Sequence, residues 1–176
     1  FSVGGHVKKA YQYLGNNVVP VSDSSNVVEN NVANAIAVDF GTIYITDWHG
    51  FTFGMSVRNF SEEAEYGYDS FQLPLTFRIG GSIDVLSFLP SLAERQSLRL
   101  ALEALHPRSY PERVNLGIEY SFLGMGHLRL GYLFNYDERN LTYGAGIQLG
   151  PLKIDYALTP FGVFDNVSRL SVGIAR

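Results

Sequence analysis

Apolar and polar residues alternate along this chain, in segments of about ten residues each. Successive side chains of a β-strand point to opposite faces, so such alternation predicts strands with one apolar and one polar face. A membrane-spanning helix would need about 18–20 continuous apolar residues, and no stretch of the chain approaches that length. The chain is therefore expected to be all-β.

Ten segments show this alternation, and the residues of their apolar face carry no charge. The residues predicted for that face are Val3, Val7, Tyr11 and Tyr13; Ile36, Val38, Phe40 and Tyr44; Phe51, Phe53, Met55 and Val57; Phe71, Leu73, Leu75, Phe77, Ile79 and Ile83; Leu98, Leu100 and Leu102; Val114, Leu116, Ile118, Tyr120 and Phe122; Leu128, Leu130, Tyr132, Phe134 and Tyr136; Leu141, Tyr143, Ala145, Ile147 and Leu149; Leu152, Ile154, Tyr156 and Leu158; and Leu170, Val172 and Ile174.

The opposite face combines glycines with single charges of both signs. Besides His6 and Lys8, its charged residues are Asp39, Arg58, Arg78, Asp84, Arg99, Glu103, Glu119, Arg129, Lys153, Asp155 and Arg169. A soluble antiparallel sandwich with its apolar face inward is one interpretation of this pattern. The length of the strands, the glycine-rich polar face and the aromatic residues near strand ends favour a membrane-spanning β-barrel, in which the charges face the lumen.

In hydrocarbon, every backbone donor and acceptor has to be paired within the protein, so membrane strands must form a closed sheet. We therefore expect an antiparallel transmembrane β-barrel with about ten strands in this chain. Charges inside a barrel persist when they are paired. Each of Arg58, Arg78, Arg99, Arg129 and Arg169 is accordingly expected to meet Asp39, Asp84, Glu103, Glu119 or Asp155.

The predicted connections alternate between long and short. Residues 15–32, 61–70, 105–111 and 159–166 are predicted long links, and residues 46–50, 123–126 and 149–151 are predicted tight turns. Residues 136–140 and 86–96 depart in length from this alternation, which otherwise places both chain ends at the periplasmic rim. Residues 97–105 also fit a helix, but a strand keeps the alternation intact. Pro74 is expected at a rim, a bulge or a strand start, because proline cannot donate to the ladder.

Residues 106–124, 127–150, 152–166 and 168–176 resemble the C-terminal part of the PorV/PorQ family of outer-membrane β-barrels. Residues 35–46, 51–60 and 72–80 look similar to the preceding strands of that family. The resemblance implies a fold like that of the long-chain fatty-acid transporter and a complete barrel of fourteen strands. Residues 1–176 would then be a single barrel domain, the C-terminal part of a longer chain, located in the bacterial outer membrane.

The resemblance implies a non-enzymatic anchor or accessory subunit of a protein secretion assembly similar to type IX secretion. Its partners would be the lipid bilayer with lipopolysaccharide and other proteins of the complex, with residues 15–32 and 61–70 as recognition surfaces. A transporter for hydrophobic small molecules such as fatty acids is the alternative, and a structural subunit of a surface assembly is a third. The net charge of −4 argues against nucleic acid as a partner.

Nothing in the sequence forms a catalytic, cofactor-binding or metal-binding motif. The chain has no cysteine and four scattered histidines, and none of these is spaced for a metal site. Residues 137–140 lack the ligand number and the glycine of a calcium loop. No serine stands in a G-x-S-x-G motif, and no phosphate-binding G-x-x-x-x-G-K is present. We therefore expect no enzyme, no cofactor and no metal.

Overall fold

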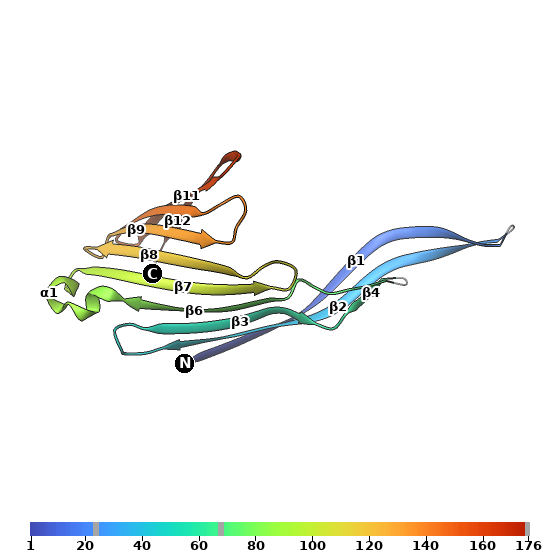
Figure 1. Cartoon of the computed structure of the whole chain (residues 1–176), viewed down its shortest axis with the longest axis horizontal. Coiled ribbons are helices and arrows are strands. Elements are labelled where there is room, and N and C mark those ends of the chain that lie inside the picture. Colours follow the sequence, from blue (N-terminus) through green and yellow to red (C-terminus); the bar gives the residue numbers. More distant parts are fainter. Residues whose placement is uncertain (23–24, 67–68, 175–176) are drawn as a thin grey trace.

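The computed structural model describes residues 1–22, 25–66 and 69–174, and β-strands make up most of its regular structure (Figure 1). The strands are β1 (Ser2–Ser22), β2 (Ser25–Ile45), β3 (Thr52–Ser61), β4 (Ala64–Tyr66), β5 (Asp69–Phe71), β6 (Thr76–Asp84), β7 (Gln96–Pro107), β8 (Arg113–Phe122), β9 (Gly126–Phe134), β10 (Leu141–Leu149), β11 (Leu152–Phe161) and β12 (Phe164–Ile174). The 3-10 helix η1 (Val85–Phe88) and the helix α1 (Pro90–Ala93) connect β6 to β7. No helix in the described ranges has the length and apolar character required to cross a membrane.

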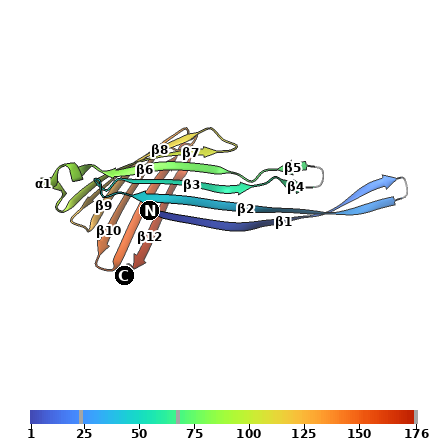
Figure 2. The ribbon, with the colours of Figure 1, turned by 90° about the horizontal axis from the view of Figure 1, so that it is seen from below.

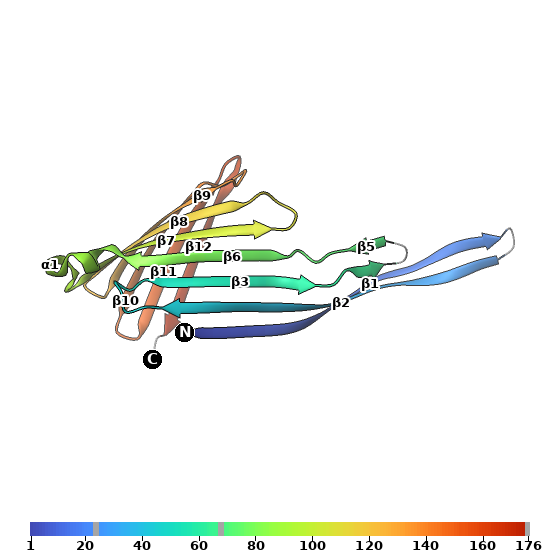
Figure 3. The ribbon, with the colours of Figure 1, turned by 60° about the horizontal axis from the view of Figure 1, so that its bottom comes forward.

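Ten of these strands form one antiparallel sheet in the order β1-β2-β3-β6-β7-β8-β9-β10-β11-β12. The expectation of an all-β chain with a ten-stranded antiparallel sheet is therefore confirmed. The sheet curls from β6 towards β12, and both chain ends lie at the rim formed by the turns 46–51, 123–125 and 150–151 (Figures 2 and 3). Within the described residues β1 and β12 are unpaired with each other, so the sheet is open.

The register places the predicted apolar residues of neighbouring strands side by side. Leu100 lies opposite Ile118, Ile118 opposite Leu130, and Leu130 opposite Tyr143. The remaining strand residues form the other face, where Glu119 lies opposite Arg129. The only other sheet in the described part of the chain is the short β4–β5 hairpin, so no second sheet covers the apolar face as a sandwich would require.

Residues 15–32 do not form the predicted loop. β1 and β2 continue as paired strands as far as Ser22 and Ser25, and their hairpin projects beyond the rest of the sheet (Figure 1). Pairs such as Val18 with Val28 explain the difference, since β-branched residues favour strand pairing. Pro20 is compatible with β1 because β1 is an edge strand.

Other boundaries also differ from those expected. The predicted link 159–166 is wrong, because β11 and β12 continue to Phe161 and Phe164 and a tight turn joins them. The link 61–70 contains the start of the β4–β5 hairpin, and β6 begins only at Thr76. Pro74 lies outside the ladder, two residues before the start of β6, in agreement with the expected position near a strand start. Residues 97–105 belong to β7, so the strand interpretation of that segment is confirmed.

The turn between β8 and β9 uses left-handed backbone at both central residues. Leu123 has φ of 56° and Gly124 has φ of 64°, and the Met125 N–H donates to the Phe122 carbonyl oxygen at 3.1 Å. These are features of a type I′ hairpin turn, in which asparagine is preferred to leucine at the first central position. We expect Leu123→Asn to raise the free energy of unfolding by about 1 kcal/mol, because asparagine adopts left-handed backbone at a lower cost than leucine. Equilibrium unfolding in urea will measure this, and a destabilised variant would contradict the turn assignment.

Gly80 permits the close approach of β6 and β7 on the polar face. A Cβ at this position would lie 2.8 Å from the Leu102 carbonyl oxygen and 3.3 Å from the Glu103 Cα, both in the backbone of β7. Gly80→Ala should therefore lower the free energy of unfolding by about 1–3 kcal/mol. Gly117→Ala is the matched control, because its Cβ would meet only the Ala101 Cβ, at 3.8 Å. Equal losses in the two variants would contradict this packing.

Candidate functional site: the polar face of the sheet

The two faces of the sheet have exposures opposite to those of a soluble protein. Leu128 and Leu130 are 53% and 44% exposed, whereas the side chain of Arg129 between them is 34% exposed. The whole chain has an accessible surface of 12,635 Å², compared with about 8,500 Å² for a compact soluble protein of this mass. Around Arg129 the charged face is therefore the more crowded one, and the leucines of the apolar face are left exposed.

Arg129 is the centre of a charged cluster on β8, β9 and β11. Its Nε donates to Glu119 Oε2 at 2.6 Å, and a terminal guanidinium nitrogen donates to Asp155 Oδ1 at 2.7 Å. The Lys153 Nζ lies 3.5 Å from the second oxygen of Asp155. Gly144 and Gly146 on β10 lie between Arg129 and Asp155, and their missing side chains leave room for the guanidinium to cross that strand. The predicted pairing of Arg129 with a carboxylate is confirmed, and the structure gives it two partners, Glu119 and Asp155.

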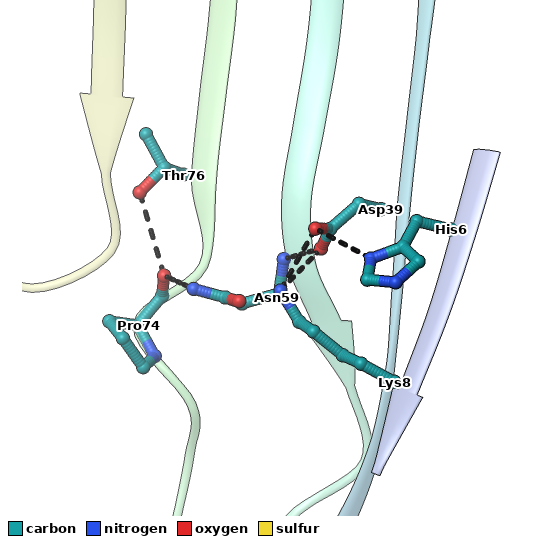
Figure 4. A network of polar contacts seen from close by, with 6 residues as sticks. All are labelled: His6, Lys8, Asp39, Asn59, Pro74 and Thr76. Carbon is teal, nitrogen blue, oxygen red and sulfur yellow. Dashed lines mark hydrogen bonds and ion pairs between the residues drawn. The ribbon is translucent and has the colours of Figure 1, made fainter. Parts of the chain in front are cut away.

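Asp39 holds a second cluster at a bulge between β2 and β3 (Figure 4). The Lys8 Nζ donates to both carboxylate oxygens of Asp39, at 2.8 and 2.9 Å, and the His6 ring lies 4.0 Å away. The backbone N–H of Asn59, whose φ is 60°, donates to Asp39 at 2.7 Å. The Asn59 side chain donates to the Pro74 carbonyl oxygen, which links the bulge to the segment before β6.

Glu103 forms a weaker group with two residues of the neighbouring strands. Its carboxylate lies 3.7 Å from an Arg78 guanidinium nitrogen and accepts a hydrogen bond of 3.0 Å from the Asn115 side-chain amide. The Arg78 Nε and the Asn115 Oδ1 are buried without a hydrogen-bond partner. These residues line a hollow of about 530 Å³ on the polar face, beside Gly54, Gly80 and Gly117.

The other predicted arginines do not form the expected ion pairs. In the described residues, Arg58, Arg99 and Arg169 have no carboxylate within 4.0 Å, so that part of the prediction is wrong. The reason is competition: Glu119, opposite Arg99, pairs with Arg129 from the other side, and Asp39, beside Arg58, is occupied by Lys8 and Asn59.

Asp84 has a structural role instead of an ion pair. Its side chain accepts hydrogen bonds of 3.1 Å from the backbone N–H groups of Leu86 and Leu98. It therefore caps η1 and joins that helix to the start of β7. The sequence did not reveal this role, or those of Asn59 and Asn115, because neutral amides and capping carboxylates have no periodic signature.

Near the rim opposite the chain ends, His106 Nδ1 lies 3.1 Å from Glu112 Oε1, a contact that was not expected from the sequence. Glu112 follows the end of β7, and its own backbone N–H, together with His106, holds the pKa of its carboxyl below the usual value. The described residues contain no group of three or more potential metal ligands.

The polar face can hold charges in place and bind polar groups of another molecule. The eleven predicted charged residues lie on this face by register, and the structure gathers Glu119, Arg129, Lys153 and Asp155 into one cluster and Arg78 with Glu103 into another. Asp39, Arg58, Asp84, Arg99 and Arg169 stand outside these two clusters. A scan against protein-family models found no match for this chain, and a search of curated proteins found none either.

Proposed function

We propose that this chain forms the wall of a bacterial outer-membrane β-barrel that acts as a non-enzymatic anchor or accessory subunit of a secretion assembly. One observation carries the membrane part: large apolar side chains are exposed on one face of the ten-stranded sheet, while the paired charged side chains on the other face, those of Asp39, Glu119, Arg129 and Asp155, are between 18% and 34% exposed. Soluble proteins rarely expose contiguous apolar patches larger than a few hundred Å². Hydrocarbon is the environment in which such a face is stable.

Closure of the barrel completes this proposal. The unpaired edges of β1 and β12 would leave rows of backbone donors and acceptors in hydrocarbon, so they must pair with each other or with additional strands. The likeness to the PorV/PorQ family favours additional strands and a barrel of fourteen. The polar face would then enclose a lumen, with lipid and lipopolysaccharide outside.

An anchoring role is favoured over transport of hydrophobic molecules. The face that would line the lumen carries the Arg129 cluster and the Asp39 cluster, which are poorly suited to an apolar substrate. In contrast, the β1–β2 hairpin extends beyond the sheet and exposes Tyr11, Tyr13, Val18 and Val28. An isolated two-stranded hairpin is only marginally stable in water, so this element is suited to contact with a protein partner.

Shortening the hairpin tests the anchoring role. Tyr13 lies opposite Val32, so residues 14–31 can be replaced by Asn-Gly, which forms a two-residue hairpin turn. We expect the shortened protein to refold in lipid but to lose a partner that co-purifies stoichiometrically with the unaltered protein in mild detergent. Isolation of the unaltered barrel without a protein partner, with fatty acid in its lumen, would favour the transporter instead.

A further inference from the structure

A groove of about 700 Å³ crosses the apolar face where β3, β6, β7 and β8 lie side by side. Its walls are large aliphatic and aromatic side chains, and none of its described lining residues is charged. Gly81 forms its floor, since the register places this glycine between Phe53 on β3 and Leu102 on β7. Gly81 has no side chain in this row, and the ring of Phe51, which also lines the groove, lies 3.5 Å from the place where its Cβ would be.

The groove begins at an aromatic cluster on the rim that carries the chain ends. Trp48 lines the groove, is 59% exposed, and meets Phe88 edge to face at 6.0 Å between ring centroids. His49 stacks on Phe88 at 3.7 Å, and Leu89 beside it is also exposed. Tryptophan combines an apolar ring with a polar N–H and is enriched at membrane–water interfaces. The groove therefore runs from a residue type suited to the lipid headgroup level into the apolar face.

The chemistry of the lining limits what can occupy this groove. The backbone groups of β6 and β7 are already paired in the sheet, and Ser82 and Trp48 are the only described lining residues with a polar side-chain group. An extended polypeptide segment placed here would leave its own amide groups without partners, which is costly in an apolar environment. A hydrocarbon chain has no such groups.

We propose that this groove binds one acyl chain of a membrane lipid, with the lipid headgroup beside Trp48. The inference rests on the proposed membrane location of the apolar face, and it adds a specific lipid site on the outer wall. This site lies on the opposite face from the Arg129 cluster and is independent of any lumen.

Trp48 is the only tryptophan of the chain, so its fluorescence reports on the site directly. The purified chain, refolded in detergent micelles, is titrated with phosphatidylcholine that carries bromine on one acyl chain, because bromine quenches tryptophan at short range. We expect quenching that saturates at one bound lipid per chain. Gly81→Leu should fill the groove and weaken this binding several-fold. Ala145→Leu, on the apolar face of β10 away from the groove, should leave it unchanged.

Ala104→Phe narrows the groove from β7 and replaces Gly81→Leu if that variant does not refold. Quenching that rises in proportion to the lipid fraction, equally in all variants, would overturn the site and leave only general lipid contact. Absence of quenching would also overturn it. A variant with both Trp48→Phe and Leu130→Trp then tests the membrane face alone, because its only tryptophan lies outside the groove. Quenching of this tryptophan would support the proposed barrel. Absence of quenching would contradict both the barrel and the lipid site.

Discussion

A charge placed on the apolar face at Leu130 should destabilise the protein strongly in a lipid bilayer. Leu130 lies in the middle of β9, between Ile118 and Tyr143 of the neighbouring strands, and is 44% exposed. In a membrane-embedded sheet this position faces hydrocarbon, where an arginine costs about 2–4 kcal/mol near the bilayer midplane. We expect Leu130→Arg to lower the free energy of unfolding by that amount, measured by equilibrium denaturation in vesicles.

The matched control places the same side chain on the polar face at nearly the same level. Thr142 lies opposite Gly131, and the next residue of β10, Tyr143, lies opposite Leu130. The glycine leaves space for the guanidinium of an arginine at position 142. Thr142→Arg should lower the free energy of unfolding by no more than about 0.5 kcal/mol, and the same holds for Gln148→Ala on the same face. If Leu130→Arg and Thr142→Arg were equally destabilising, the assignment of the two faces to lipid and lumen would be wrong.

Removal of Arg129 should give the second large effect. Arg129→Ala takes away two charge-assisted hydrogen bonds, and it leaves Glu119 without its cation and Asp155 with Lys153 alone. A hydrogen bond to a charged group contributes about 1.5–3 kcal/mol. Since these side chains are a quarter to a third exposed, solvent screening reduces the sum, and we expect a loss of about 2–3 kcal/mol in the free energy of unfolding.

The control for Arg129 is Arg99→Ala on β7. Arg99 is exposed, and in the described residues it has no carboxylate within 4.0 Å, so its removal should cost less than about 0.5 kcal/mol. Equal losses in Arg129→Ala and Arg99→Ala would contradict the role assigned to the ion pairs of Arg129.

The strand pattern was predictable from the sequence because alternation is a local property. The residues predicted for the apolar face of β7 to β12 share one face in the structure, since each strand keeps a period of two and the sheet joins sequential neighbours. Residues 97–105 also have helical spacing, but they form part of β7, because that strand completes the ladder between β6 and β8.

The ends of the strands were less predictable. Residues 15–32 carry the Asn, Ser and Pro content of a loop, yet cross-strand pairing extends β1 and β2 through them. The hydrogen bonds of a hairpin depend on the register of its two strands, and the amino-acid composition of a segment does not determine that register. Similarly, residues 159–166 were predicted to form a long link, but a register shift near Thr159 and a φ of 45° at Gly162 allow a tight connection.

The partners of individual charges were predictable only where geometry left one choice. Arg129 lies opposite Glu119 and is separated from Asp155 only by glycines, so its pairing follows from the alternation and the strand order. Asp39 was expected to meet an arginine, but the bulge at Arg58 and Asn59 turns a backbone N–H towards it, and Lys8 supplies the cation. A bulge of this kind depends on the three-dimensional strain of the sheet.

The most direct test of the account is a cysteine scan along β10, because the chain contains no cysteine of its own. Single cysteines at 141, 142, 143, 145, 147 and 148 are refolded into vesicles and treated with a water-soluble, membrane-impermeant thiol reagent, and separately with a lipid-soluble one. We predict that cysteines at the Thr142 and Gln148 positions react with the water-soluble reagent, while those at the Leu141, Tyr143, Ala145 and Ile147 positions react only with the lipid-soluble one. Reaction of all six positions with the water-soluble reagent, or the reverse alternation, would contradict the assignment of the two faces.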